Sequence, residues 1–157
     1  MIDREGYRKN VGIIICNSKN KLLICKRYGE NSWQFPQGGI MEDESPEKAM
    51  HRELFEEVGL QAKDILILGK TKNWLKYDLP KKYQRKTNNQ LCLGQKQIWF
   101  LLRLQSSDKY IILNKSKKPE FDDWQWTSLD KPLEFVIDFK RNVYKEALNE
   151  LLPILDN

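Results

Sequence analysis

The sequence has little of what a zinc site, a disulfide framework or a membrane span requires. It has one histidine and three cysteines, Cys16, Cys25 and Cys92, without C-x-x-C spacing, so a zinc site of nitrogen and sulfur ligands is not expected. Each cysteine lies in an apolar stretch, which favours a small core residue in a reducing compartment. The longest apolar runs, such as residues 98–102, have five residues, whereas a bilayer-spanning helix needs roughly 20. A transmembrane helix is therefore excluded, and any metal should have oxygen ligands.

Repeats and low-complexity linkers are also missing from the 157 residues, of which 40% are apolar and 31% charged. One domain, residues 1–157, is predicted, because a domain averages roughly 150 residues. A chain of this length buries roughly two thirds of its unfolded surface, so its core needs no disulfide. Charges among the first ten residues exclude a signal peptide and predict a cytoplasmic protein. The net charge of +5 gives a mild preference for anionic partners.

Apolar and β-branched runs predict the strands. Residues 11–16 and 22–25 flank the sequence Asn-Ser-Lys-Asn, a pattern typical of a β-hairpin. Further strands are predicted over residues 65–68, 98–104, 110–113 and 121–126. In the last of these, the period-two geometry of a strand places Trp124 and Trp126 on one face.

Two segments predict helices. Ser45 and Pro46 form a cap and first-turn pair, and Gly59 follows the last periodic residue, so a helix is expected over 46–58. A second helix is expected over 139–152, where apolar residues recur four apart and Pro153 ends the pattern. Strands that outnumber helices favour a mixed sheet covered by helices, an α+β or α/β sandwich.

Three glutamates share one face of the first predicted helix. Glu53, Glu56 and Glu57 fall within an arc of about 100° and are expected on an exposed face beside an apolar stripe. Their mutual repulsion costs a few tenths of a kcal/mol per pair, and a divalent cation would reverse its sign. Oxygen donors favour Mg²⁺, Mn²⁺ or Ca²⁺ over zinc. A glutamate-rich helix face is more often simply solvated, so the choice between a solvated face and a metal site depends on the neighbouring residues.

The neighbouring residues form a longer pattern. From Gly38 to Leu60 the sequence fits G-x5-E-x7-R-E-U-x-E-E-x-G-U, where U is a bulky aliphatic residue, at every constrained position. This string resembles the signature of the Nudix hydrolases. The resemblance implies an α/β/α sandwich whose loop, helix and loop hold Mg²⁺, or Mn²⁺ in its place, and hydrolyse a nucleoside diphosphate linked to another moiety. Asp43 stands where many members have glycine, and aspartate tolerates left-handed turns.

The resemblance assigns roles to individual residues. The metal ligands it implies are Glu53, Glu56, Glu57 and Glu120. Glu120 lies outside the signature in the sequence Pro-Glu-Phe and is a candidate catalytic base, the alternative being a solvated loop residue. Arg52 should brace the carboxylates through charge-assisted hydrogen bonds. Gly38 and Gly39 lack a Cβ, which lets the backbone approach metal and phosphate closely.

Segments that flank the signature, one of which overlaps its first residues, resemble the bacterial RNA pyrophosphohydrolases, one branch of this family. These segments are residues 6–12, 33–40, 71–75, 94–97 and 119–121. Members of that branch convert the 5′-triphosphate end of RNA to a 5′-monophosphate and so promote mRNA decay. Diadenosine polyphosphate hydrolases share much of the pattern and remain an alternative, with an inactive RNA-binding module less favoured. Some relatives are stimulated by diaminopimelate epimerase, which makes that enzyme a candidate activator.

Residues for substrate binding follow from the same resemblance. Arg8 and Arg27 match basic residues that reach the phosphates and the nucleotide. Phe139 and Lys140 match a pocket for the base of the second nucleotide, and Tyr77 matches an aromatic residue near the first, with ordinary core packing as the alternative. Between residues 70 and 86, seven basic residues and one acid are interleaved with aromatics, a composition typical of single-strand binding or of a solvated loop.

Overall fold

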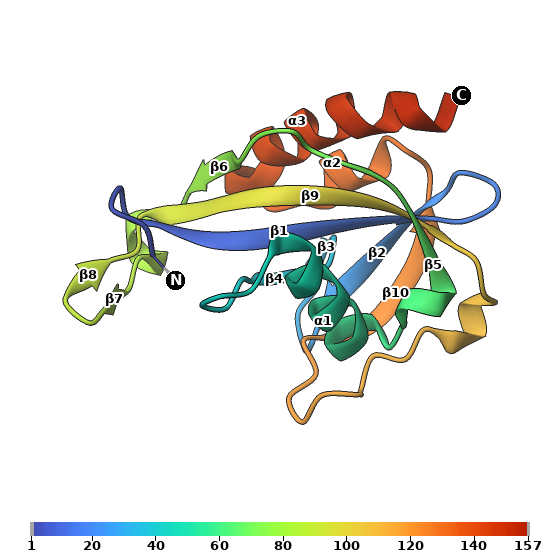
Figure 1. The fold of residues 1–157 in the computed structure, drawn as a ribbon, viewed down its shortest axis with the longest axis horizontal. Helices are drawn as coiled ribbons and strands as arrows, with labels where there is room; N and C mark the ends of the chain where they lie inside the picture. The colour runs from blue at the N-terminus through green and yellow to red at the C-terminus, as the bar shows by residue number, and fades with distance from the viewer. Residues whose placement is uncertain (1, 157) are drawn as a thin grey trace.

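The structure is a computed structural model that describes residues 2–156, and a mixed eight-stranded sheet forms its centre (Figure 1). The main path of the sheet runs through β10 (Phe121–Thr127), β2 (Leu22–Arg27), β1 (Tyr7–Cys16), β9 (Gly94–Leu104) and β5 (Ile65–Lys70). Strands β1 and β9 pair in parallel along the full length of β1, and the other neighbours on this path are antiparallel. Short strands join the sheet as β3 (Trp33–Gln34) on β2, β4 (Gln37–Gly39) on β1 and β6 (Leu75–Asp78) on β9.

Helices cover both faces of the sheet, as predicted for an α/β/α sandwich. Alternation along β1 sends Ile13 into the core shared with α1 (Pro46–Val58) and Ile14 into the core shared with α3 (Arg141–Leu151). The short helix α2 (Lys131–Phe135) packs beside α3. Apolar side chains on both faces of the long central strands therefore fix the three layers.

The first helix has the predicted bounds. The hydroxyl of Ser45 accepts a hydrogen bond from the Lys48 amide at 3.2 Å, and Gly59 ends the helix in the left-handed region at φ 79°. A Cβ at Gly59 would lie 2.7 Å from the carbonyl oxygen of Ile112. Glycine is therefore required both by backbone conformation and by the closeness of the next segment.

The other predictions are confirmed in part. The hairpin of β1 and β2 is present, with Cys16 opposite Leu22, and Trp124 and Trp126 lie 6.0 Å apart between ring centroids. The strand predicted over 110–113 is wrong. There η3 (Asp108–Tyr110) is followed by an irregular stretch, because the Ile112 amide donates to the Val58 carbonyl at 2.8 Å and so packs this stretch on the end of α1.

The last helix is shorter than predicted. It begins at Arg141, after η4 (Asp138–Lys140), and the chain continues through Pro153 as η5 (Leu152–Asp156). Proline lacks the N–H that an early helical position leaves unpaired, which explains why it is accommodated there. The sequence reasoning missed β3, β4, β6 and α2. It also missed the short elements η1 (Ala62–Asp64), η2 (Lys81–Tyr83), β7 (Lys86–Thr87) and β8 (Gln90–Leu91).

The three cysteines, Cys16, Cys25 and Cys92, are buried and free, as expected. Within residues 2–156, none of the helices combines the length and the apolar character needed to cross a membrane.

Candidate active site

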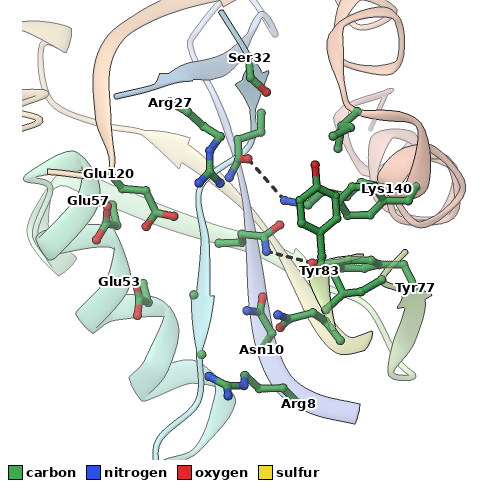
Figure 2. Close-up of a pocket in the computed structure, with 18 of the residues that line it drawn as sticks. Arg8, Asn10, Arg27, Ser32, Glu53, Glu57, Tyr77, Tyr83, Glu120 and Lys140 are labelled. Atoms are coloured by element: carbon green, nitrogen blue, oxygen red, sulfur yellow. Dashed lines mark hydrogen bonds between the residues drawn. The ribbon is translucent and has the colours of Figure 1, made fainter. Parts of the chain in front are cut away.

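A cavity of about 560 Å³ opens between α1 and the turn that precedes α3 (Figure 2). All the predicted site residues except Arg52 line it: Arg8, Arg27, Gly38, Gly39, Glu53, Glu56, Glu57, Tyr77, Glu120, Phe139 and Lys140. They come from strands β1, β2, β4 and β6, from α1, from the loop before β10 and from η4. The fold thus brings together residues that are more than 100 positions apart in the sequence.

The carboxylates form one wall of this cavity. One carboxylate oxygen from each of Glu53, Glu56 and Glu57 lies within 4.8 Å of the other two. The expectation that this helix face is exposed is wrong for Glu53 and Glu57, which are only 8% and 7% exposed. Strand β4 packs against α1, and a Cβ at Gly38 would clash with the carboxylate of Glu53. Gly38 is therefore needed for close packing of the strand on the glutamate.

Burial perturbs the acidity of these side chains. Burial, together with the negative charges of Glu120 and Glu53, raises the pKa of Glu57 to about 8. Burial also raises the pKa of Glu53, although the hydrogen bond from Arg52 opposes the change. Among the described residues, the buried Oε2 of Glu57 has no hydrogen-bond partner. An unpaired buried oxygen within a group of repelling carboxylates fits a divalent cation with oxygen ligands.

Arg52 lies behind the carboxylates and connects them to the loop before α1. Its guanidinium donates to Glu53 Oε1 at 2.8 Å, to Glu44 at 2.8 and 2.9 Å and to the Gly39 carbonyl at 2.7 Å, with Glu56 Oε2 farther away at 3.5 Å. The hydrogen bonds from Arg52 lower the pKa of Glu44 to about 2. The role of Gly39 is therefore to offer its carbonyl, since a Cβ there would meet open space.

The same loop shows how the departure at Asp43 is accommodated. Asp43 adopts the left-handed conformation at φ 62°, the backbone geometry that glycine would adopt most easily. Aspartate is among the residues that tolerate it. Next to it, Glu44 accepts from the Met41 amide at 3.0 Å, which closes the turn.

The opposite wall of the cavity is cationic and aromatic. Lys140 is 7% exposed, and its Nζ lies 3.4 Å from Gln34 Oε1. Burial, together with the positive charge of Arg27, lowers the pKa of Lys140 to about 8. The ring of Phe139 lies 6.0 Å from that of Tyr77 and 5.7 Å from that of Tyr83, measured between centroids. Tyr77 is both a buried core residue and part of the cavity.

A set of amides that line or adjoin the cavity was missed by the sequence reasoning. Gln97 donates to Asn10 Oδ1 at 2.9 Å and accepts from the Trp99 indole at 3.0 Å. The side-chain oxygens of Gln37 and Gln95, which line the cavity, are buried without a partner among the described residues. The one available signal was the spacing of Gln95 and Gln97, which places both amides on one face of β9.

The basic segment 70–86 divides between the two faces of the sheet. Lys76 lies 3.7 Å from Glu5, on the face away from the cavity. Trp74 is on that face as well, with the ammonium groups of Lys9 and Lys96 at 5.8 and 5.5 Å from its ring. Tyr83, in contrast, lines the cavity. The sequence reasoning treated these residues as one surface, whereas alternation along β6 places Lys76 and Tyr77 on opposite faces.

Comparisons with known proteins agree with this arrangement. The family model described as the NUDIX domain matches residues 6–147. The chain belongs to the Nudix family. This Nudix chain is 56% identical over 155 residues to the RNA pyrophosphohydrolase of Proteus mirabilis, covering 99% of this chain and 88% of that relative. It is 54% identical to the RNA pyrophosphohydrolase of Haemophilus influenzae, covering 99% of this chain and 79% of that one.

Solved structures confirm the Nudix fold. The E. coli dihydroneopterin triphosphate pyrophosphohydrolase superposes with a TM-score of 0.69 at 16% identity, covering 91% of this chain and 98% of that chain. A binary complex of a C. elegans Ap4A hydrolase gives a TM-score of 0.64 at 18% identity, covering 93% and 98%. At such low identity the likeness concerns the fold alone.

Proposed function

We propose that this Nudix hydrolase acts on the 5′-triphosphate end of RNA, releases pyrophosphate and leaves a 5′-monophosphate that promotes mRNA decay. The observation that carries the proposal is the cavity itself, where buried carboxylates face a cationic and aromatic wall. Identities of 53–56% to RNA pyrophosphohydrolases over nearly the whole chain support the same substrate. An mRNA substrate and three free cysteines agree with a cytoplasmic location.

Four carboxylates are proposed to hold the metal: Glu53, Glu56, Glu57 and Glu120. When bound, Mg²⁺, or Mn²⁺ in its place, supplies Lewis-acid stabilisation of the charge on the phosphates. The carboxylates supply negative charge, and three of them have fixed positions on α1, where Arg52 also holds Glu53 before any ligand arrives. Such preorganisation lowers the barrier, since nothing has to reorganise at the moment of reaction.

We assign the deprotonation of the attacking water to a carboxylate, with Glu120 as our candidate. In the described part of the chain no ion pair engages Glu120, whereas Glu53 and Glu56 are both within reach of Arg52. Water attacks one phosphorus of the triphosphate, its proton passes to the carboxylate, and the anhydride bond on that phosphorus breaks. The leaving phosphate takes the bond's electron pair.

Substrate recognition falls to the other wall. Arg8 and Arg27 are proposed to bind phosphates, because both are cationic and line the cavity. Phe139 and Lys140 are proposed to hold the base of the second nucleotide, and Tyr77 to lie near the first. Stacking on an aromatic ring contributes about 1 to 3 kcal/mol per base and tolerates different bases.

The test compares a triphosphorylated oligonucleotide with GTP and diadenosine tetraphosphate at matched Mg²⁺. We expect kcat/KM to be about 10-fold higher for the oligonucleotide, because the contact to its second base aligns the reacting phosphates. Mass spectrometry of products formed in heavy-oxygen water identifies the phosphorus that is attacked. Equal or faster hydrolysis of the small molecules would favour the dinucleoside polyphosphate function, and no hydrolysis at all would indicate a binding module.

Diaminopimelate epimerase is proposed as an activator on the basis of the resemblance alone. Adding it to the same assay tests this, and an unchanged rate with the oligonucleotide would dismiss it.

A further inference from the structure

A projecting segment between β6 and β9 is not used by the reaction proposed above. Residues 79–93, here called the basic arm, contain η2, β7 and β8 and extend from one end of the sheet (Figure 1). The basic arm carries four basic residues, Lys81, Lys82, Arg85 and Lys86, and no aspartate or glutamate. All four are exposed. A segment with this many charges is usually a solvated loop. Whether the basic arm binds a ligand therefore has to be judged from its position and from the contacts of its charged side chains.

The basic arm is held in a defined conformation. At its base, the Leu79 amide donates to the Leu93 carbonyl, and the Leu93 amide donates to the Gly6 carbonyl, both at 2.8 Å. At its tip, Asn88 and Asn89 adopt φ 52° and 66°, the left-handed pair of a tight hairpin turn. Little conformational entropy would therefore be lost when the basic arm binds a ligand.

The basic arm also continues the cationic wall of the cavity. Tyr83 lines the cavity (Figure 2), and its ring packs 5.7 Å from the ring of Phe139. Leu79 also lines the cavity. On the outer side, the ammonium group of Lys82 lies 5.1 Å from the Tyr83 ring. An unbroken path of contacts thus leads from the proposed site of the second base to the first exposed cations of the basic arm.

The cations of the basic arm differ from those on the opposite face. Lys76 and Lys96 have acidic partners, Glu5 at 3.7 Å and Asp3 at 2.6 Å. Within residues 2–156, no ion pair involves Lys81, Lys82 or Lys86. Cations without acidic partners attract an external anion without first breaking an internal pair.

We propose that the basic arm binds the phosphates of the RNA downstream of the second nucleotide. This inference rests on the proposed function and extends it from the triphosphate end to the body of the RNA. The three lysines would provide the contacts, because Arg85 already donates to the Lys82 and Gln84 carbonyls at 2.8 and 3.2 Å. Contacts to phosphates carry no sequence information, so the basic arm would increase affinity for any single strand.

The first test measures binding. A variant with Lys81→Gln, Lys82→Gln and Lys86→Gln is compared with a control with Lys19→Gln, Lys21→Gln and Lys63→Gln. The control removes the same charge from exposed lysines elsewhere on the surface. Fluorescence anisotropy of a labelled 5′-monophosphorylated octanucleotide, without divalent metal, gives the dependence of log K on log salt. We expect the slope to become shallower by about 0.7 per lost contact, or about 2 in the arm variant, and to stay unchanged in the control.

The second test measures turnover with a triphosphorylated dinucleotide and with an octanucleotide that begins with the same dinucleotide. The arm variant should lose roughly 10-fold in kcat/KM for the octanucleotide, because three phosphate contacts are missing. Its dinucleotide rate should stay near that of the wild type. An equal loss for both substrates would overturn the proposal, because it would place the effect in the cavity. An equal effect of the control would also overturn it, because net charge would then be responsible.

The two proposals fail in distinguishable ways. If the wild-type protein does not hydrolyse the dinucleotide, the proposed function is wrong, and the salt slopes still decide whether the basic arm binds RNA. If the wild-type protein hydrolyses both substrates and the slopes of all three proteins agree, the basic arm is a solvated loop and the proposed function stands.

Discussion

The two walls of the cavity are built in opposite ways. The acidic wall takes three of its four carboxylates from a single turn-and-a-half of α1, and Arg52 on the same helix supports it. The cationic wall draws Arg27 from β2, Tyr77 from β6 and Lys140 from η4. The residues of the acidic wall are therefore mostly close together in the sequence, whereas those of the cationic wall come together only when the chain folds.

Each wall also buries charges of one sign. Burial raises the pKa of Glu57 to about 8 on the acidic side and lowers the pKa of Lys140 to about 8 on the cationic side. A bound cation would offset the repulsion among the buried negative charges of the acidic wall, and a bound phosphate would offset the buried positive charge of the cationic wall. The comparison supports our proposal that the acidic wall performs the chemistry and that the cationic wall selects the substrate. Variants of the two walls should consequently differ in which kinetic constant they change.

The largest effect is expected from the acidic wall. Glu57→Gln and Glu53→Gln should each lower kcat by at least about 100-fold, because a charged metal ligand is lost. The fold should survive, since glutamine has nearly the same shape. Thermal unfolding without metal should show equal or higher stability, because repulsion among the buried carboxylates is reduced.

The matched control for both variants is Glu47→Gln, an exposed carboxylate in the first turn of the same helix. It should leave kcat unchanged. Near wild-type turnover by either cavity variant at saturating Mg²⁺ would show that the metal does not bind at this face.

The next effect concerns the support behind the acidic wall. Arg52→Ala should lower kcat by about 10- to 100-fold, the usual cost of losing a group that orients metal ligands. The free energy of unfolding should fall by about 1 to 3 kcal/mol, because Glu44 and the Gly39 carbonyl lose a charged donor. Arg52→Lys keeps the charge without the forked geometry and should recover only part of the activity. Full recovery of activity by Arg52→Lys would show that only the positive charge of this residue matters. Urea unfolding measures the change in the free energy of unfolding.

The contrast between the walls also explains how far the sequence could predict the structure. The cap at Ser45, the glycine at position 59 and the spacing of the glutamates are local features, and the structure has them at the predicted positions. Their physics operates within one turn of helix, so a short window contains it. The burial of Glu53 could not be predicted in this way, because it depends on β4 packing against α1.

Other features required knowledge of the whole fold. The stretch 110–113 has a strand-like sequence, and its partner turned out to be the end of α1, where Ile112 donates to Val58. The division of the basic segment between two faces depends on the register of β6 with β9. The amide contacts of Asn10 and Gln97 join strands far apart in the chain. The resemblance identified the residues of the cationic wall, while their physical neighbours came only from the structure.

The cationic wall should give a smaller and more selective effect. Phe139→Ala should erase most of the roughly 10-fold advantage of an oligonucleotide over a mononucleotide triphosphate, because the stacked base contributes about 1 to 3 kcal/mol. Mononucleotide hydrolysis should be nearly unchanged. Phe135→Ala, which truncates an aromatic side chain that is 44% exposed, is the control. An equal loss on both substrates would show that Phe139 supports the cavity and does not select for RNA.

The smallest expected effect is on the pH dependence of the free energy of unfolding, which differs between the two walls. The folded pKa of Glu57, about 8, exceeds its ordinary value of about 4.3, so the native state holds a proton that the unfolded state releases. Metal-free protein should therefore lose stability as the pH rises from about 5 to about 8, by at least about 1 kcal/mol. Lys140 has the opposite sign in another window. Its folded pKa of about 8 lies below its ordinary value of about 10.4, so its contribution rises only above about pH 8.

Urea unfolding in EDTA at several pH values measures both contributions. Carboxylates with lowered pKa values, such as Glu44 at about 2, change their protonation below this range and do not interfere. Glu57→Gln should flatten the decline in stability between about pH 5 and about pH 8. Lys140→Met should leave this decline in place, because Lys140 is charged in both the folded and the unfolded state through most of the range. Added Mg²⁺ should stabilise the wild type most at the upper end, where no proton competes for the carboxylate. If the fall in stability with rising pH persists in Glu57→Gln, Glu57 is not the group whose deprotonation destabilises the acidic wall.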